Sequence, residues 1–202
     1  MASKIKVDQL ETADGTGTIA LQNQLSGMTT ASVPTLDYTK MPSGSIIQVV
    51  NTTTGSNGTI ASNSNSYSDT GFLTGTITPL HTGSKIYVKW SGFIPHVNPN
   101  NGNYGVRWKA YRSVASGSYA QVSSNIDGGV FKQAAGSGEW VDFFCTEEVF
   151  DTPSYTSGQS ISYKLYFRQG NGNSNHGYFN HMGGTGNGVS VQRKVTLMEI
   201  KG

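Results

Sequence analysis

The chain has 202 residues, which is enough for one sizeable core and too few for two large ones. Charged residues make up 13% of it and the net charge is +2, so Lys and Arg are too sparse to predict a nucleic-acid-binding protein. No apolar run comes near the roughly 18 residues that cross a bilayer, so we expect no membrane insertion.

The polar residues are mainly Gly, Ser, Thr and Asn, and aromatic residues make up 10% of the chain. That combination is typical of an all-β protein with many turns. The start, MASKIKVDQLE, lacks the apolar stretch of a signal peptide, so we expect synthesis in a cytoplasm without secretion by that route. The single cysteine, Cys145, excludes an intrachain disulfide, and its alternation with Val141 and Phe143 predicts a small buried apolar residue.

Residues 1–40 form a segment of distinct composition. Ile5 and Val7 alternate with charged residues, which predicts a short strand, and a turn at 14–15 precedes a second apolar stretch at 18–21. The segment has too few apolar residues for a core of its own. It is therefore either a flexible arm or a piece that becomes ordered against other chains.

From residue 41 onward, alternating segments follow at the close spacing of a β-sandwich. The first has apolar residues on both faces, so we expect both faces to be covered. In the others the apolar residues share one face, which predicts one buried face per strand. We predict strands at 44–50, 73–78, 85–90, 104–113, 140–150, 160–168 and 189–200.

The inward and outward faces of these strands differ in composition. The outward faces carry Thr together with Tyr87, Tyr111 and Tyr166 instead of dense charge, which favours contact between subunits, although composition alone equally allows a monomer. The predicted core residues are Leu73, Ile77, Ile86, Val88, Trp90, Val106, Trp108, Ala110, Val141, Phe143, Cys145, Val149, Ile161, Tyr163, Leu165, Phe167, Val191, Val195 and Leu197.

The sequence argues against an enzyme. A nucleophilic triad needs Ser or Cys beside a His and a carboxylate, and no G-x-S-x-G motif is present. Glu147 and Glu148 are neighbours on a predicted strand and point to opposite faces, so they cannot act together as a glycosidase pair. The four histidines lie in predicted turns or loops: His81, His96, His176 and His181.

The sequence also gives no metal site within one chain. His176 and His181 lie close together, but zinc needs three or four ligands and their loop has no Asp, Glu or Cys. The remaining alternative is a metal site on a trimer axis, where three subunits each supply one copy of the same histidine. We predict no catalytic residue, no metal ligand and no cofactor.

Two long loops carry the candidate binding residues, because loops on a rigid sandwich are where binding residues concentrate. Asn amides can hydrogen-bond hydroxyl groups and aromatic rings can stack on sugar faces, so the composition suits glycan. The alternative is that both loops are Asn/Gly turns without a ligand. The candidates are His96, Asn98, Asn101, Asn103 and Tyr104 in 95–104, and Asn173, His176, Tyr178, Phe179 and Asn180 in 171–187.

Two stretches carry a family resemblance. SYSDTGFLTGTITPLHTGSKIYVKWSGFI at 66–94, read with the C-terminal VSVQRKVTLMEIKG, resembles the jelly-roll domain at the outer end of phage tail fibres and other virion appendages, of the marine phage and cyanophage kind. The opening pattern KIKVD…GTGTIAL is similar to N-terminal segments of phage structural proteins. The resemblance implies an antiparallel jelly-roll β-sandwich at 41–202, preceded by an extended N-terminal arm with short strands at 1–40.

The resemblance also implies a function. The protein would be a virion structural protein, assembled in the host cytoplasm, that forms a homotrimeric short fibre or spike. The head would bind a host receptor, glycan included, and the arm would bind tail or capsid proteins. The alternative is a capsid decoration or head-fibre protein, because the chain lacks a long shaft; a carbohydrate-binding module or depolymerase ranks below both. The attachment residues would be Ile5, Val7, Leu10, Ile19 and Leu21.

Overall fold

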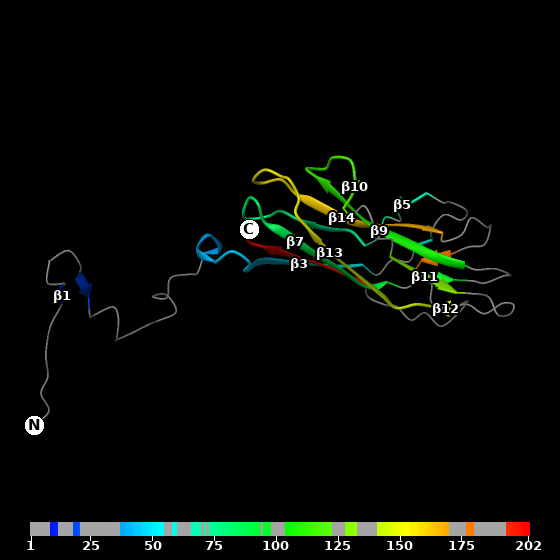
Figure 1. Cartoon of the computed structure of the whole chain (residues 1–202), viewed down its shortest axis with the longest axis horizontal. Coiled ribbons are helices and arrows are strands. Elements are labelled where there is room, and N and C mark those ends of the chain that lie inside the picture. The colour runs from blue at the N-terminus through cyan, green and yellow to red at the C-terminus, as the bar shows by residue number, and fades with distance from the viewer. Residues whose placement is uncertain are drawn as a thin grey trace, which may run out of the picture. The chain divides into compact units, whose positions relative to one another are not determined.

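A computed structural model gives the structure of the chain (Figure 1). The chain divides into two compact units, Met1–Lys40 and Met41–Gly202. In the first unit, β1 (Gln9–Glu11) pairs antiparallel with β2 (Thr18–Ala20), and a short 3-10 helix, η2, spans Tyr38–Lys40. The residues described are 9–11, 18–20, 37–54, 58–59, 66–69, 71, 73–93, 95–97, 104–122, 128–132, 141–169, 177–179 and 193–202.

The second unit is all-β with antiparallel pairing, as the composition predicted. Its first sheet has the strand order β13-β7-β16-β3. The apolar alternation of these strands places one face of the sheet on the core. The strands are β3 (Ile46–Thr54), β7 (Lys85–Phe93), β13 (Cys145–Asp151) and β16 (Arg193–Ile200).

Four short strands extend this first sheet at one end. Their order is β12-β8-β15-β4, and each is next in chain order to the long strand at the same place in the order β13-β7-β16-β3. The register also continues, because Cys145 lies opposite Phe93 and Asp142 lies opposite His96. The short strands are β4 (Gly58–Thr59), β8 (Pro95–Val97), β12 (Val141–Asp142) and β15 (Gly177–Phe179).

The other sheet is built on the pair β9 and β14, which stay in register from Ile161 opposite Val114 to Gln169 opposite Val106. On the free side of β9 lie β10 and β11, and on the free side of β14 lie β5 and β6. The strands are β5 (Ser68–Asp69), β6 (Gly75–Ile77), β9 (Tyr104–Val114), β10 (Ala120–Gln121), β11 (Gly128–Lys132) and β14 (Ile161–Gln169).

The two sheets face each other across one apolar core. The ring of Phe93 in β7 meets Trp108 of β9 edge-on at 5.1 Å between centroids and Phe167 of β14 at 6.1 Å. The alternation in the sequence predicted every residue of this core except Phe93, which lies beyond the predicted end of its strand, because burial follows the period of two along each strand. Fully or nearly fully buried are Leu73, Ile77, Ile86, Val88, Trp90, Phe93, Val106, Trp108, Ala110, Ile161, Tyr163, Leu165, Phe167, Val195 and Leu197.

Three sequence predictions need adjustment. The first strand was expected to be covered on both faces, but Ile46 and Val49 are 52% and 50% exposed, because the outer face of their sheet is open. Phe143, Cys145 and Val149 are half-buried and pack against the core from outside its centre. Val191 and the side chain of Val141 lie outside the described residues.

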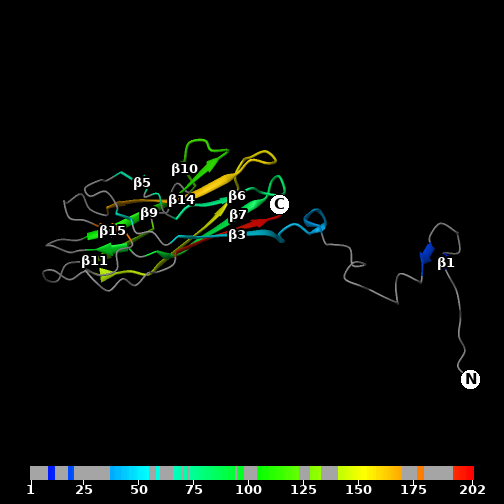
Figure 2. The ribbon, with the colours of Figure 1, turned by 180° about the vertical axis from the view of Figure 1, so that it is seen from behind.

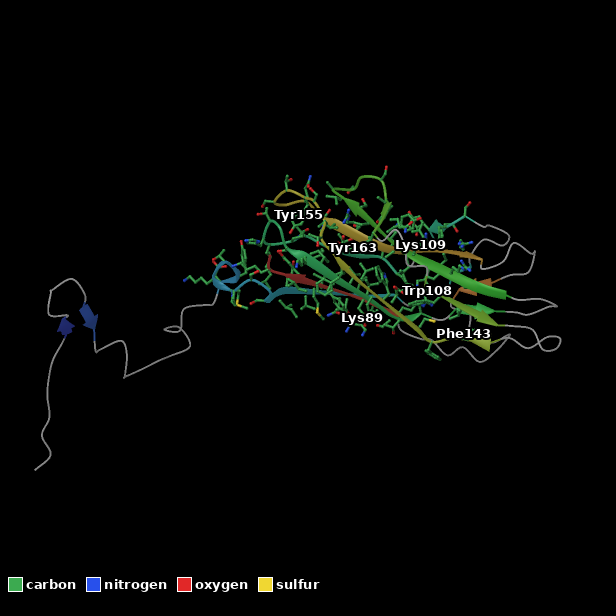
Figure 3. All side chains as sticks on the ribbon, in the orientation of Figure 1. Lys89, Trp108, Lys109, Phe143, Tyr155 and Tyr163 are labelled. Carbon is green, nitrogen blue, oxygen red and sulfur yellow. The ribbon has the colours of Figure 1, made fainter. Side chains whose placement is uncertain are left out.

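Polar side chains also connect the two sheets. The indole N–H of Trp90 donates to the carbonyl oxygen of Leu73 at 2.8 Å, and Leu73 has φ +59°. The indole N–H of Trp108 donates to Glu147 Oε2 at 2.7 Å, and the Tyr163 hydroxyl donates to an Asp151 oxygen at 2.8 Å. Figure 3 labels Trp108 and Tyr163 among the side chains of the second unit. These bonds satisfy polar groups that would otherwise be costly to bury.

Candidate functional site

The first candidate surface is the backbone strip formed by β12, β8, β15 and β4, here called the loop-end strip. His96 in β8 lies directly opposite Tyr178 in β15, and Pro95 lies opposite Phe179. Asp142 of β12 lies on the other side of His96. Figure 2 shows β11 and β15 toward the same end of the second unit. The two Asn-rich segments, about eighty residues apart in sequence, therefore meet at one place in the fold.

The structure corrects where some candidate residues lie. His96, Tyr178 and Phe179 were predicted in loops but belong to strands, because the first sheet continues past β7 and β16. Tyr104 is the first residue of β9. The other candidates, Asn98, Asn101, Asn103, Asn173, His176 and Asn180, lie outside the described residues.

The predicted attachment residues fall in the first unit. Leu10 of β1 lies opposite Ile19 of β2, so two of the five share one short hairpin ladder. Ile5, Val7 and Leu21 lie outside the described residues. The pairing places two apolar positions side by side on a small two-stranded sheet, which is the kind of element that needs a partner for stability.

The second candidate surface is the outer face of the β9–β14 pair, together with Tyr67 beside β5 and Tyr119 beside β10. We call it the tyrosine–cation face. Because alternate residues of these strands point into the core, the residues between them point outward. The face consists of Tyr67, Arg107, Lys109, Tyr111, Tyr119, Lys164, Tyr166 and Arg168.

Three tyrosines gather at one end of the tyrosine–cation face. The rings of Tyr111 and Tyr166 stack with centroids 4.1 Å apart and planes 24° apart. Tyr119, next to β10, lies 6.1 Å from Tyr166, and the Lys164 ammonium lies 4.6 Å from the centre of the Tyr119 ring. The predicted outward direction of Tyr111 and Tyr166 agrees with this arrangement.

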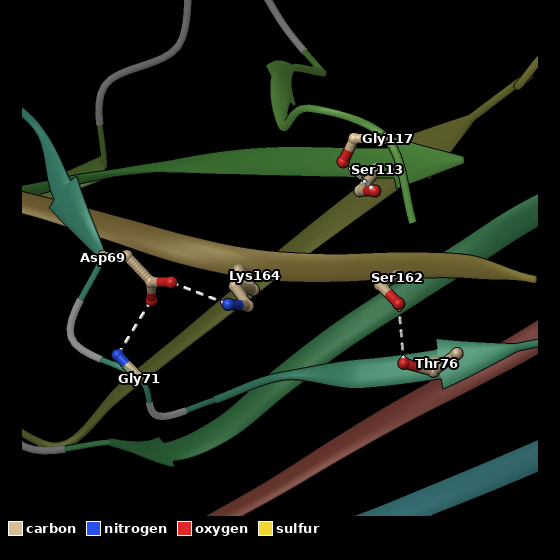
Figure 4. Close-up of polar contacts among 7 residues, drawn as sticks. All are labelled: Asp69, Gly71, Thr76, Ser113, Gly117, Ser162 and Lys164. Atoms are coloured by element: carbon tan, nitrogen blue, oxygen red, sulfur yellow. Dashed lines mark hydrogen bonds and ion pairs between the residues drawn. The ribbon is translucent and has the colours of Figure 1, made fainter. Parts of the chain in front are cut away.

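Asp69 of β5 fixes Lys164 at this end. The Lys164 ammonium and an Asp69 oxygen are 2.6 Å apart, and the other Asp69 oxygen accepts the Gly71 N–H at 2.8 Å (Figure 4). Burial lowers the pKa of Lys164, but the hydrogen bond and charge of Asp69 outweigh it and leave that pKa raised. Burial, followed by the charge of Asp69, raises the pKa of Tyr166. Lys164 is therefore charged and held in place.

The other end of the tyrosine–cation face is organised around Tyr67. Lys109 lies 5.0 Å from the centre of its ring and the Arg168 guanidinium lies 5.1 Å from it. Arg168 also lies directly opposite Arg107 across the β9–β14 ladder.

The carboxylates and the thiol of β13 serve packing and solvation. Glu147 accepts the Trp108 indole N–H, whereas Glu148 faces outward and pairs with Lys89 at 2.9 Å. Burial, then the charge of Glu147, raises the pKa of Cys145 to about 11.

Among the described residues no cluster of three or more His, Cys, Asp or Glu has the geometry to hold a metal ion. No helix in the described part of the chain is long and apolar enough to span a membrane.

No protein-family model matches the chain, and no curated protein is similar to it in sequence.

The sequence predicted only part of the tyrosine–cation face. Tyr111 and Tyr166 gave a signal as outward aromatics, but Tyr67 and Tyr119 lie outside the long strands. They join this face because Tyr67 directly precedes β5, which pairs with β14, and Tyr119 directly precedes β10, which pairs with β9.

Proposed function

We propose that the second unit is a jelly roll. Eight of its strands, taken in chain order, are β3, β6, β7, β9, β11, β13, β14 and β16. One sheet then has the first, eighth, third and sixth strands side by side, and the other has the second, seventh, fourth and fifth. That alternation between sheets is the jelly-roll order, and jelly rolls are common in viral capsid and lectin domains.

On that basis the protein is proposed to be a virion structural protein: a short fibre or spike, with residues 1–40 as the attachment segment and the second unit as a head that binds a host surface, glycan included. The observation that carries this proposal is the meeting of the two Asn-rich segments at the His96–Tyr178 pair. Binding residues carried on strand ends of a rigid sandwich are well placed to contact a large partner.

The proposal includes self-association into a homotrimer. On the outer face of the first sheet, Met198 lies opposite both Val49 and Tyr87, and Phe150 lies opposite Tyr87. This row crosses four strands, and Phe150 is 64% exposed. Apolar and aromatic side chains contiguous over a sheet face favour subunit contact over exposure to water.

The test is to locate the chain in intact particles by cryo-electron microscopy and to measure host adsorption of particles that carry His96→Ala with Tyr178→Ala. The proposal predicts density at an outward fibre tip and weaker adsorption with unchanged head folding. Density on the capsid shell, with normal adsorption, would favour a decoration protein instead. Absence of the chain from particles would overturn both.

A further inference from the structure

The strands at the sheet edges of the second unit differ in length and charge. An edge strand exposes backbone N–H and C=O groups to other chains, so proteins keep such strands short or place charged residues on them. The edge strands β4, β5, β10 and β12 have two residues each, β6 has three and β11 has five. The edge strand β13 has seven residues, but three of them are carboxylates: Glu147, Glu148 and Asp151.

The strand β3 is the exception among these described edge strands. It has nine residues, IIQVVNTTT, and none of them is charged, Pro or Gly. Seven of the nine are β-branched, a side-chain shape that suits a strand. One side of β3 pairs with β16, and no described strand pairs with its other side. A long, uncharged edge of this kind is a template for a further strand.

The geometry of β3 also suits an added strand. Its ladder with β16 is regular from Gln48 opposite Glu199 to Thr54 opposite Arg193. The one register shift lies at the other end, beside Ile46, so the bulge that often protects an edge is confined to the start of the strand. Seven consecutive residues therefore present an uninterrupted edge.

We propose that β3 pairs antiparallel with β3 of a second copy of this chain, so that two first sheets join into one sheet across a two-fold axis. A second copy fits because two uncharged strands meet without repulsion, whereas two copies of β13 would bring their carboxylates together. This contact goes beyond the proposed function. It joins two heads edge to edge, whereas the homotrimer is proposed on the outer face of the sheet.

The pairing also covers apolar surface at this edge. The side chains of Ile46 and Val49 on β3 are 52% and 50% exposed. A strand added beside β3 places its own side chains about 4.5–5.5 Å from those of β3 on the same face. β-Branched side chains pack well on such neighbours, and β3 supplies them from both copies. Pairing therefore satisfies backbone groups and removes apolar side chains from water at once.

Two exposed positions allow β3 to be charged while its ladder with β16 is kept. Asn51 lies opposite Thr196, and Asn51→Lys gives up one exposed hydrogen bond from the Thr196 hydroxyl at 2.8 Å. Thr53 lies opposite Lys194, so Thr53→Glu gains a favourable cross-strand pair within the head. Because the two variants have opposite charges, an effect that they share cannot come from the net charge of the chain.

The experiment is sedimentation equilibrium of the full chain over a range of concentrations, for the parent, Asn51→Lys and Thr53→Glu. The matched control is Thr146→Lys, which places a lysine at an exposed position of the other edge strand, β13. Melting temperatures measured at low concentration show whether each variant is folded. Since the parent is measured by itself, its self-association is tested even where a variant is unstable.

We expect the parent to reach twice the mass of the species that each β3 variant forms. The dissociation constant of that step should rise about tenfold or more in both variants, because each places an unpartnered charge in the contact between the two strands. Thr146→Lys should associate like the parent. The factor of two is measured against the variants, so it is independent of any contact through the outer face of the sheet.

Three results would overturn the inference. One is a parent that stays monomeric at every concentration, which would leave this edge to a strand of another protein. Another is an assembly whose mass both folded β3 variants keep; if that mass is three chains, it supports the proposed homotrimer instead. The third is equal weakening by Thr146→Lys, which would place the contact elsewhere. All are read with the isolated chain, so they leave the virion proposal to its own test in particles.

Discussion

Arg112 donates from one guanidinium nitrogen to both carboxylate oxygens of Asp151, at 2.7 Å each, and so joins β9 of one sheet to β13 of the other. Asp151 is 7% exposed and also accepts the Tyr163 hydroxyl at 2.8 Å. The carboxylate thus sits between the layers with its oxygens satisfied. A buried charge is tolerated only with partners of this kind.

Replacing Asp151 by Ala should therefore destabilise the head strongly. The change leaves the Arg112 charge and the Tyr163 hydroxyl without their acceptor, and breaking one side of a buried pair costs about 3–5 kcal/mol. Urea unfolding followed by tryptophan fluorescence measures the loss. Lys89→Ala, which breaks the exposed pair with Glu148 at 2.9 Å, serves as the control and should leave the urea midpoint unchanged. Equal midpoints for both variants would contradict the role given to Asp151.

The core tryptophans provide a second prediction. Trp90 is fully buried and its indole N–H holds the Leu73 carbonyl at 2.8 Å, so Trp90→Ala should cost about 3–5 kcal/mol. Trp108→Ala should cost a similar amount because it lies among Phe93 and Phe167. Calorimetry measures both. Phe144, 68% exposed, gives the matched control, whose change to Ala should alter stability by about 0.5 kcal/mol or less.

Sequence alone predicted the apolar core because alternation is a local property. Ile86, Val88 and Trp90 follow one another with period two, and all three are fully buried. Glu199 could not be predicted in the same way. It lies inward and fully buried, where its carboxylate accepts the Leu80 N–H at 2.8 Å and other donors from the 81–84 turn. Its partners lie more than a hundred residues away, so no local pattern could reveal them.

The two candidate surfaces also combine features that local sequence patterns predict with features that depend on distant residues. The outward direction of Tyr111 and Tyr166 could be read from alternation, but their stacking depends on the β9–β14 register. Lys109 and Arg168 both lie over the Tyr67 ring because β5, the strand that follows Tyr67, pairs with β14, and no sequence motif predicts that pairing. The meeting of His96 with Tyr178 likewise required the strand order of the sheet extension.

Gly75 provides a third prediction, on the packing of β6. An added Cβ there would lie 2.5 Å from Leu197 Cδ1 and 2.7 Å from Val195 Cγ1, which is closer than carbon atoms approach. Gly75→Ala should therefore destabilise the head by about 1–3 kcal/mol through overpacking. Thr78→Ala, at an exposed position of the same segment, is the control and should change stability by about 0.5 kcal/mol or less. An unchanged melting temperature for Gly75→Ala would show that β6 does not pack on β16 in this way.

Alkaline pH should unfold the head through Tyr163. Burial, then the charge and hydrogen bond of Asp151, raises the pKa of Tyr163 above its ordinary 10.0. The folded state therefore keeps the phenolic proton after the unfolded chain has lost it, so this stability is complete below pH 10 and falls as pH rises further. The slope is about 1.4 kcal/mol per pH unit for one proton. Tyr163→Phe should reduce that slope in urea unfolding measured at several alkaline pH values; an unchanged slope would assign the effect to other groups.

Cys145 should react slowly with thiol reagents while the chain is folded. Burial, then the Glu147 charge, raises the pKa of Cys145 from 9.0 to about 11, and the thiolate is the reactive form. At pH 8 a shift of that size lowers the thiolate fraction about a hundredfold, so iodoacetamide should label the native chain about a hundredfold more slowly than the urea-unfolded chain. Glu147→Gln keeps an oxygen for the Trp108 indole N–H and removes the charge, so it should raise the native rate by a smaller factor than unfolding does. Equal rates for folded and unfolded protein would place Cys145 in open solvent, against its packing on the core.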